Sequence, residues 1–314
     1  MAIVQSRTRS LMTAPSSGTT SGSPPRCGTP LKTTLCLLAA AAGAAQQQEK
    51  FEVSAEARQG EVIRIAGRAS GRFSAVWNKR TVPLFPQQDG SLLGLMPVDA
   101  TARPGVYSLR IEDEARRAVQ TAKFTVRDAR FRIQNIRATA AMKSLTPSPG
   151  EMETMREFNR TVTARRMWRD RFVPPVPQCV NSPFGVRRFH NGKPTGNYHR
   201  AVDLLAPSGQ PIAAANDGVV KVARMFGYHG GTVGIDHGQG VITHYLHMSK
   251  VVATEGAEVK QGDVIGYVGA TGFATGAHLH WGLYIHGVPT NPGPWTTELR
   301  PCSAAPAPDP ARRR

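Results

Sequence analysis

Short runs that alternate apolar with polar residues dominate positions 51 to 127. Examples are FEVSAEA, EVIRIAG, FSAVW, GVYSLRI and AKFTVR, with Gly, Pro, Asp or Asn between most of them. Alternation of period two is typical of strands with one face on a core, and frequent turn residues are typical of a small sandwich. The pattern predicts an Ig-like β-sandwich over residues 46–128. It holds no cluster of reactive side chains, which favours a spacer or substrate-docking module over catalysis.

Residues 129–178 have a different pattern and are predicted to link two domains. Ser148, Pro149 and Glu151 occupy the N-cap, first and third positions of a predicted helix, which is a capping-box arrangement. The sequence that follows, REFNRTVTARRMWRDR, is strongly basic. We therefore expect a basic linker helix. A solvated charged face is slightly favoured over an electrostatic contact with an anionic polymer.

Short strands resume after Cys179. The runs are AVDLLA, GVVKVA, TVGIDH, VITHYLHMS, DVIGYVGA and HLHWGLYI, with glycine-rich turns between them, and none has the 3.6-residue apolar period of a helix. They predict a second β domain over residues 179–302, built from two stacked or wrapped sheets, so the whole chain is expected to be mainly β. The Pro- and Ala-rich residues 303–314 are predicted to be a disordered tail.

The start of the chain has the features of an export signal. An apolar run, TTLCLLAAAAGAA over residues 33–45, follows a basic stretch and ends in small residues. This predicts a signal peptide over residues 1–45 and an exported protein, the alternative being a basic tail followed by a buried helix. A membrane-spanning helix needs about 20 apolar residues, so no stable membrane insertion is expected after cleavage.

Export changes the count of cysteines. Cys27 and Cys36 would leave with the signal peptide, so Cys179 and Cys302 would be the cysteines of the mature chain. In an oxidising compartment we expect a disulfide between them, the alternative being two unpaired thiols. The bond would join the two ends of the second β domain.

Length and composition narrow the function further. The 314 residues, 40% of them hydrophobic, suit two folded domains and exclude a wholly disordered chain. The formal charge is +17, but residues 179–302 carry only +2 of it, whereas all nine histidines lie between His190 and His286. Imidazole chemistry is therefore confined to the second domain. No nucleic-acid-binding motif accompanies the basic surplus, so no nucleic-acid partner is expected.

The sequences HRAVD and HLH supply candidate metal ligands. Zinc accepts imidazole nitrogen and carboxylate oxygen, and a catalytic zinc site holds three such ligands and a water. His199 and Asp203 would lie about 13 Å apart on a straight strand, too far to share an ion, so we expect His199 in a loop that bends into the strand of Asp203. His280 is the expected third ligand. His278, two residues earlier, projects from the same strand face and is free to take part in catalysis.

His247 in HYLHMS is a further candidate for the site. Strand alternation places Tyr245 on the same face as His247 and His244 on the other, which disfavours His244. Tyr245 is favoured as a packing residue. The other histidines are expected to have surface or turn positions: His190, His229, His237 and His286.

Four segments of the second β domain resemble a known family. YHRAVDLLAPSGQPIAAANDGVV, IDHGQGVITHYLHMSK, VKQGDVIGYVGATG and TGAHLHWGLYIHG are similar, in that order, to the lysostaphin/LytM-type zinc metallopeptidases. The resemblance covers about residues 179 to 293, with SPFGVR upstream and VPTNP downstream as further similar features. The N-terminal sandwich and linker resemble those of exported bacterial members much more loosely.

The resemblance implies a site and an activity. His199, Asp203 and His280 would hold one zinc ion per chain, and His247 and His278 would be the catalytic pair, in a groove of a compact antiparallel β domain. The implied activity is hydrolysis of peptide bonds in peptidoglycan cross-links or stem peptides, in the periplasm or the extracellular cell wall. The family usually has Gly where this chain has Ala201, so a slightly different loop geometry is expected there.

Two other functions compete with hydrolysis. VATEGAEVKQGDVIGYVGA resembles half of a biotinyl or lipoyl carrier barrel, but the lysine motif at a hairpin tip that such carriers need is missing from this sequence. The other alternative keeps the LytM-type fold and uses it, without chemistry, to bind and activate another cell-wall hydrolase. The intact set of ligands disfavours it.

Overall fold

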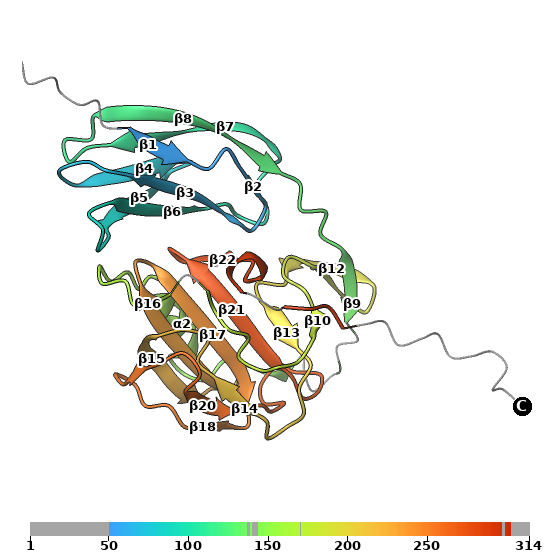
Figure 1. Ribbon diagram of the computed structural model, residues 1–314. Helices are drawn as coiled ribbons and strands as arrows, with labels where there is room; N and C mark the ends of the chain where they lie inside the picture. Colours follow the sequence, from blue (N-terminus) through green and yellow to red (C-terminus); the bar gives the residue numbers. More distant parts are fainter. Residues whose placement is uncertain (1–49, 137–138, 140–143, 170, 297–298, 303–314) are drawn as a thin grey trace, which may run out of the picture. The chain divides into compact units, whose positions relative to one another are not determined.

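The computed structural model describes residues 50–136, 139, 144–169, 171–296 and 299–302. The predicted signal peptide and the predicted disordered tail lie outside these residues. No helix among the described residues is long and apolar enough to cross a membrane. Strands make up most of the regular structure, which confirms the mainly β prediction (Figure 1).

Eight strands between residues 51 and 127 are hydrogen-bonded in the order β1-β3-β6-β5-β4-β7-β8-β2. Their bounds are β1 (Phe51–Val53), β2 (Glu56–Arg58), β3 (Val62–Gly67), β4 (Phe73–Trp77), β5 (Arg80–Pro86), β6 (Leu92–Pro97), β7 (Gly105–Glu112) and β8 (Ala118–Arg127). Strand β5 pairs with β4 along its length and with β6 at its end, so the sheet folds over into two layers (Figure 1). This confirms the predicted β-sandwich.

The alternation in the sequence accounts for the core of the sandwich. In β4, Phe73, Ala75 and Trp77 are buried, whereas the two residues between them are partly exposed. The ring of Trp77 meets that of Phe124 from β8 edge-on, with 5.0 Å between ring centroids. Buried aromatic pairs of this kind contribute about 0.5–1.5 kcal/mol beyond the area that they bury.

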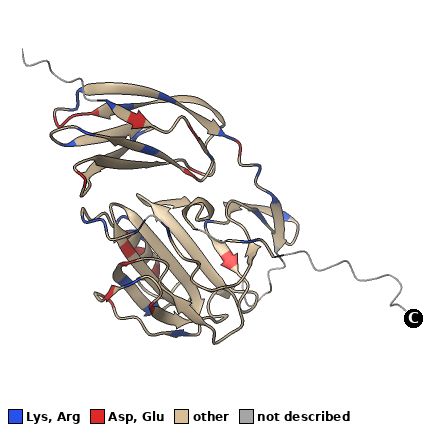
Figure 2. Ribbon diagram, viewed as in Figure 1, with Lys and Arg blue, Asp and Glu red and all other residues tan. Residues whose placement is uncertain are grey.

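A second sheet begins after Cys179 and follows the order β10-β13-β21-β17-β16-β15-β19, with β22 paired to β21. Its strands are β10 (Val180–Ser182), β13 (Val202–Leu204), β15 (Gly218–Met225), β16 (Gly231–Gly238), β17 (Val241–Met248), β19 (Glu258–Val259), β21 (Leu279–Ile285) and β22 (Val288–Thr290). Neighbouring strands in it are antiparallel. Strands β17 and β21 carry no charged residue (Figure 2), and every residue of β17 is buried.

Two three-stranded sheets, β12-β11-β9 and β14-β20-β18, complete this part of the chain. Their strands are β9 (Ile133–Ile136), β11 (Arg187–His190), β12 (Lys193–Tyr198), β14 (Pro211–Ala213), β18 (Lys250–Val251) and β20 (Val264–Tyr267). A short 3-10 helix, η1, covers Gly293–Trp295. Strand β9 belongs to the predicted linker by sequence, yet it pairs in parallel with β11 of the second domain.

Helix α2 (Glu151–Asn159) begins three residues after the predicted N-cap. Gly150 has a φ of +75°, a left-handed conformation that keeps the helix from extending back to Ser148. The hydroxyl of Ser148 accepts the N–H of Gly227 at 2.7 Å instead of an N–H of the helix. The carboxylate of Glu151 accepts the N–H of Ser148 at 2.7 Å, so the return half of the predicted capping box is present.

The predicted basic character belongs to the segment after the helix and not to the helix. Helix α2 contains three glutamates and one arginine. Across the described residues of 160–171 the chain continues without helix. The run Thr161, Val162 and Thr163 follows the end of the helix, and β-branched side chains of this kind have low helix propensity.

Helix α2 packs against the second sheet. Phe158 is buried, and its ring lies 4.9 Å from the ring of His244 on β17. A Cβ atom on Gly234 of β16 would lie only 2.5 Å from the Phe158 ring, so this close approach requires glycine at position 234. The glycine on the strand thus allows helix α2 to pack this closely against the sheet.

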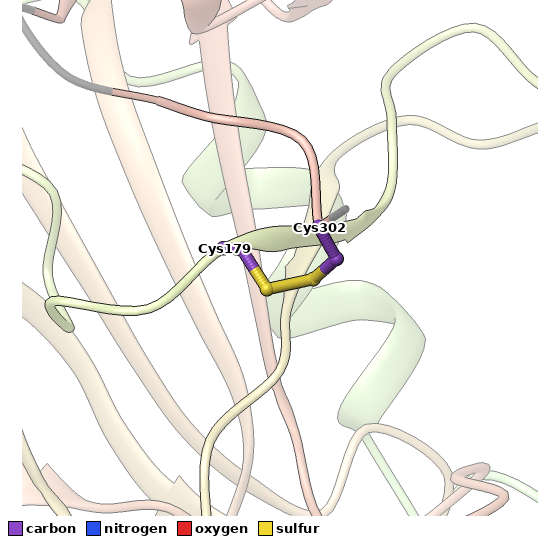
Figure 3. Close-up of a disulfide and its surroundings, with 2 residues drawn as sticks. All are labelled: Cys179 and Cys302. Carbon is purple, nitrogen blue, oxygen red and sulfur yellow. A yellow bond between two sulfur atoms is a disulfide. The ribbon is translucent and has the colours of Figure 1, made fainter. Parts of the chain in front are cut away.

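Cys179 and Cys302 form a disulfide, with 4.8 Å between their Cα atoms (Figure 3). This confirms the predicted pairing over the alternative of two free thiols. Beside the bond, the N–H of Val180 donates to the carbonyl of Arg300 at 2.8 Å, and the N–H of Cys302 donates to the carbonyl of Val180 at 3.0 Å. The disulfide therefore joins the start of strand β10 to a segment that follows η1.

His237 is fully buried, so its predicted surface or turn role is wrong. Its Nδ1 donates to the carbonyl of Asp217 at 2.7 Å, and its Nε2 lies 2.7 Å from the hydroxyl of Thr243. These two bonds satisfy the ring inside the domain, which is why a polar residue is tolerated there. Burial lowers the pKa of His237 to about 4, so the ring is neutral near pH 7.

This buried histidine makes stability depend on pH. Below about pH 6.5, His237 is protonated in the unfolded chain but stays neutral in the folded chain. The free energy of unfolding should therefore fall by up to about 1.4 kcal/mol per pH unit as the pH is lowered, until the pH approaches 4. We expect the urea midpoint, measured with chelator present, to be lower at pH 5.5 than at pH 7.5. The variant His237→Gln should show a weaker dependence. A midpoint that does not change over this range would contradict the assignment of a buried neutral ring.

Candidate functional site

Three potential metal ligands lie on neighbouring segments of the second domain. Asp203 of β13 is directly opposite His280 of β21 in their antiparallel ladder, so both side chains leave the same face of the sheet. His199 precedes β13, and the chain bends through Arg200 and Ala201 before the strand begins. The predicted bend between His199 and Asp203 is therefore present.

The donor atoms of these residues converge. Nε2 of His199 lies 3.0 Å from Oδ1 of Asp203, Nδ1 of His280 lies 2.9 Å from the same oxygen, and the two nitrogens are 3.3 Å apart. Ligands about 2.0–2.1 Å from a tetrahedral zinc ion are separated by roughly 3.3 Å. The set of two imidazole nitrogens and one carboxylate oxygen therefore fits a zinc ion in both chemistry and spacing.

Hydrogen bonds to the other side of the His199 ring orient it toward this centre. Its Nδ1 lies 3.0 Å from the carbonyl of Pro183 and 3.1 Å from the hydroxyl of Ser182. A carbonyl only accepts, so Nδ1 carries the proton and Nε2 presents a lone pair to the centre. Support of this kind fixes the tautomer of a metal-binding histidine.

The carboxylate of Asp203 is held in its charged form. Burial alone would raise its pKa, but the nearby rings of His199 and His280 hold the pKa well below its usual range. The other oxygen, Oδ2, lies 3.4 Å from a guanidinium nitrogen of Arg188, which is itself mostly buried. Asp203 is thus ionised and oriented before any metal binds.

Ala201 fits the bend although the resemblance implies glycine there. Its φ is not positive, so the alanine side chain imposes no left-handed strain, and it is fully buried. The three donor atoms still converge.

His247 and His278 stand beside the three ligands. Nδ1 of His247 donates to the carbonyl of Thr271 at 2.8 Å, and Nδ1 of His278 donates to the carbonyl of Gly276 at 2.8 Å. When such a ring carries its proton on Nδ1 only, Nε2 is the nitrogen that can accept a proton. Their ring centroids are 4.9 Å apart, and Nε2 of His278 lies 3.8 Å from Oδ1 of Asp203.

Burial lowers the pKa of His247 to about 3, and the neighbouring rings of His280 and His278 contribute to this shift. The His247 ring is therefore neutral over the physiological range. A neutral ring with a free Nε2 is the form that a general base requires.

A bulge in β17 changes which residues face the site. Val233 of β16 is opposite Tyr245, whereas Gly231 is opposite Met248, so β17 has one extra residue in this interval. His247 has a φ of +65°, and bulges of this kind re-aim side chains next to active sites. His247 consequently turns to the face that also holds His244.

The predicted assignment of faces on β17 was therefore wrong. His244 lines the same groove as His247, whereas Tyr245 is buried in the core and its hydroxyl accepts the N–H of Ala215 at 2.8 Å. The role of Tyr245 as a packing residue agrees with these contacts. His244 stacks on Tyr284 with 4.4 Å between ring centroids, and burial lowers its pKa to about 3.

The five predicted site residues line one open groove with a volume of about 870 Å³. Helix α2 and the segment before it also contribute to its wall. These contributing residues are Pro147, Met152, Met155, Arg156 and Asn159. Arg188 and Arg200 line it as well, so the groove presents guanidinium groups suited to a ligand that carries carboxylates.

Several groups around the site were not found from the sequence. Arg188 and Ser182 orient two of the ligands, and the carbonyl of Thr271 orients His247. His229, expected at the surface, instead lines the groove and contacts Glu151 of helix α2. These partners are distant in sequence from the residues that they support, and no local pattern marks them.

Residues 197–292 match a family described as Peptidase family M23. The DD-carboxypeptidase/endopeptidase Mpg of Neisseria meningitidis is 43% identical over 119 residues, which cover 38% of this chain and 27% of that protein. The peptidoglycan DD-endopeptidase ShyC of Vibrio cholerae is 42% identical over 113 residues, covering 36% of this chain and 26% of that protein. The chain therefore matches only about a quarter of the length of these relatives.

The fold extends the similarity beyond this segment. A crystal structure assigned to peptidase M23 from Pseudomonas aeruginosa superimposes with a TM-score of 0.56, covering 72% of this chain and 88% of that one, at 23% sequence identity. At this identity the likeness concerns the fold alone. The sequence match places the metal-ligand candidates and the catalytic histidine candidates within one recognised domain. Through its residues 197–292, the chain is similar to peptidase family M23.

Proposed function

We propose that this chain is an exported, zinc-dependent endopeptidase that hydrolyses peptide bonds in peptidoglycan cross-links or stem peptides. The observation that carries the proposal is the convergence of His199, Asp203 and His280 beside two histidines whose Nε2 atoms are free. The names of the relatives, which include peptidoglycan DD-endopeptidases, support the choice of substrate. Action on peptidoglycan implies a location in the periplasm or the cell wall.

The donor set suits the chemistry of zinc in a hydrolase. When bound, zinc lowers the pKa of its water from about 15.7 toward about 7 and polarises a carbonyl. Nε2 of either His247 or His278 would accept the proton of the attacking water, and the other ring would hydrogen-bond the oxygen on which charge develops. The carbonyls of Thr271 and Gly276 accept Nδ1–H of both rings, so Nε2 is the nitrogen available for the reaction. The ring that accepts the water proton needs Nε2 without a proton, whereas the ring that donates to the developing oxyanion needs a proton on Nε2 as well.

A non-catalytic role as an activator of another cell-wall hydrolase is the alternative. It requires the fold but neither the metal nor the free imidazole nitrogens. In this chain all three candidate ligands, the supporting bonds to His199 and Asp203, and both additional histidines are present together. A protein that only binds another hydrolase does not need this set of residues, so hydrolysis is the function that we favour.

Digestion of purified sacculi tests the proposal. The zinc-loaded protein should convert cross-linked muropeptides into smaller products whose summed mass exceeds that of the parent by one water per bond cut, and mass spectrometry of the products would identify the bond. Treatment with chelator should stop the reaction and added zinc should restore it. Products that are absent with zinc, or equally abundant with chelator, would contradict the proposed function.

A further inference from the structure

The carboxylate of Glu151, at the start of helix α2, is fully buried and surrounded by donors. It accepts the backbone N–H groups of Ser148 at 2.7 Å, Gly227 at 3.1 Å, Tyr228 at 3.2 Å and His229 at 2.8 Å. It also accepts Nδ1–H of the His229 ring at 2.6 Å. A capping residue needs only the bond to Ser148, so the other four bonds, all to residues 227–229, require a different explanation.

These four bonds hold a loop, residues 226–230, between β15 and β16. Glu151 would be costly to bury without them, because a buried carboxylate must be fully hydrogen-bonded. Burial raises its pKa, but the bonds from Ser148, His229 and Tyr228 outweigh this and leave the pKa below its usual value. The carboxylate is therefore charged, and its donors leave no room for it to act as a metal ligand.

The loop in turn holds His247. The carbonyl of His229 accepts the backbone N–H of His247 at 3.1 Å, at the bulge where His247 has its positive φ. The carbonyl of Tyr228 accepts the N–H of Phe273 at 2.8 Å. Phe273 lies in a second loop, between β20 and β21, and this loop also supplies the Thr271 carbonyl that orients the His247 ring. Both the backbone and the ring of His247 are thus held by two loops that are bonded to each other.

The two loops approach each other as closely as their backbones permit. A Cβ atom on Gly272 would lie 2.4 Å from the carbonyl oxygen of Tyr228, and one on Gly230 would lie 2.3 Å from the hydroxyl oxygen of Thr271. Contact this tight transmits a shift of one loop to the other. Glu151, together with the hydroxyl of Ser148, fixes the first loop from outside the segment that matches the peptidase family.

We propose that Glu151 is a positioning residue for His247, acting through loop 226–230 to hold the His247 ring over the metal centre. The inference rests on the proposed function for the role of His247 in the reaction. Helix α2 would then be a working part of the peptidase and not only a connection between domains. Misplacement of a catalytic group by about 1 Å can cost up to about 100-fold in rate.

The test compares Glu151→Gln with Glu153→Gln in the full chain. Glu151→Gln would keep the size of the side chain but turn an amide N–H₂ toward N–H donors, whereas Glu153 is half-exposed and pairs with Arg156 on the same helix. We expect Glu151→Gln to lower kcat about 10- to 100-fold with KM and zinc affinity within about twofold of the parent, and Glu153→Gln to leave all three unchanged. His229→Ala, which keeps the backbone donors, should have a smaller effect than Glu151→Gln.

A second readout does not depend on activity. Nitrogen-15 spectra of histidine side chains report the tautomer of His247, which should be the Nδ1–H form in the parent and a mixture in Glu151→Gln. A normal kcat and an unchanged tautomer in folded Glu151→Gln would overturn the proposal. Loss of zinc and a lower Tm with an unchanged tautomer would also overturn it, because Glu151 would then be only structural. If the parent does not hydrolyse peptidoglycan, the proposed function fails, while the tautomer still tests the positioning by Glu151.

Discussion

The variant His278→Ala should lose hydrolysis by about 10²- to 10⁴-fold while it keeps its zinc. The Nε2 of His278 lies beside the metal ligands but is not one of the three converging donors. Its removal takes away a proton acceptor or an oxyanion donor and leaves the coordinating atoms in place. The measurement is kcat on a defined cross-linked muropeptide, together with zinc content by elemental analysis.

The variant His286→Ala serves as the control, because His286 lies in the turn between β21 and β22 and does not line the groove. It should keep its activity. Full turnover by His278→Ala, with zinc bound, would remove His278 from the mechanism and leave His247 to act alone.

The variant His280→Ala should lose the metal and the activity together. Nδ1 of His280, which lies 2.9 Å from Oδ1 of Asp203, would be lost, and only His199 and Asp203 would remain of the three candidate donors. Loss of a supporting group already costs about 10- to 100-fold in metal affinity, so removal of a ligand should cost more than about 100-fold. Titration with a competing zinc chelator measures this affinity directly.

The contrast between the two variants separates coordination from catalysis. His278→Ala should bind zinc as the parent does, and His280→Ala should not. If His280→Ala retained one tightly bound zinc ion, a different set of ligands would have to hold the metal.

Much of the site could be predicted from sequence because strands impose simple rules. Residues two apart share a face, which related His278 to His280, and the reach of a straight strand required the bend between His199 and Asp203. The rule failed at His247, where an extra residue in β17 and a positive φ reverse the faces of His244 and Tyr245. A bulge depends on pairing with a neighbouring strand, which local alternation does not encode.

The predicted linker shows the same limit of prediction from local sequence. The pattern Ser148 to Glu151 predicted a helix start, and a helix is present, but the two side chains serve a loop nearly 80 positions later instead of closing a full capping box on each other. A buried carboxylate and a surface cap have the same local sequence. What distinguishes them is the tertiary contact with residues 227–229, which only the folded chain provides.

The proposed function depends on one zinc ion that His199, Asp203 and His280 share. Anomalous diffraction at the zinc edge, from crystals of the zinc-loaded chain, tests this most directly. We expect one strong peak about 2.0–2.2 Å from Nε2 of His199, Oδ1 of Asp203 and Nδ1 of His280, with His247 and His278 outside the coordination shell. A peak at another site, or one at which His247 or His278 replaces any of the three donors, would contradict this assignment.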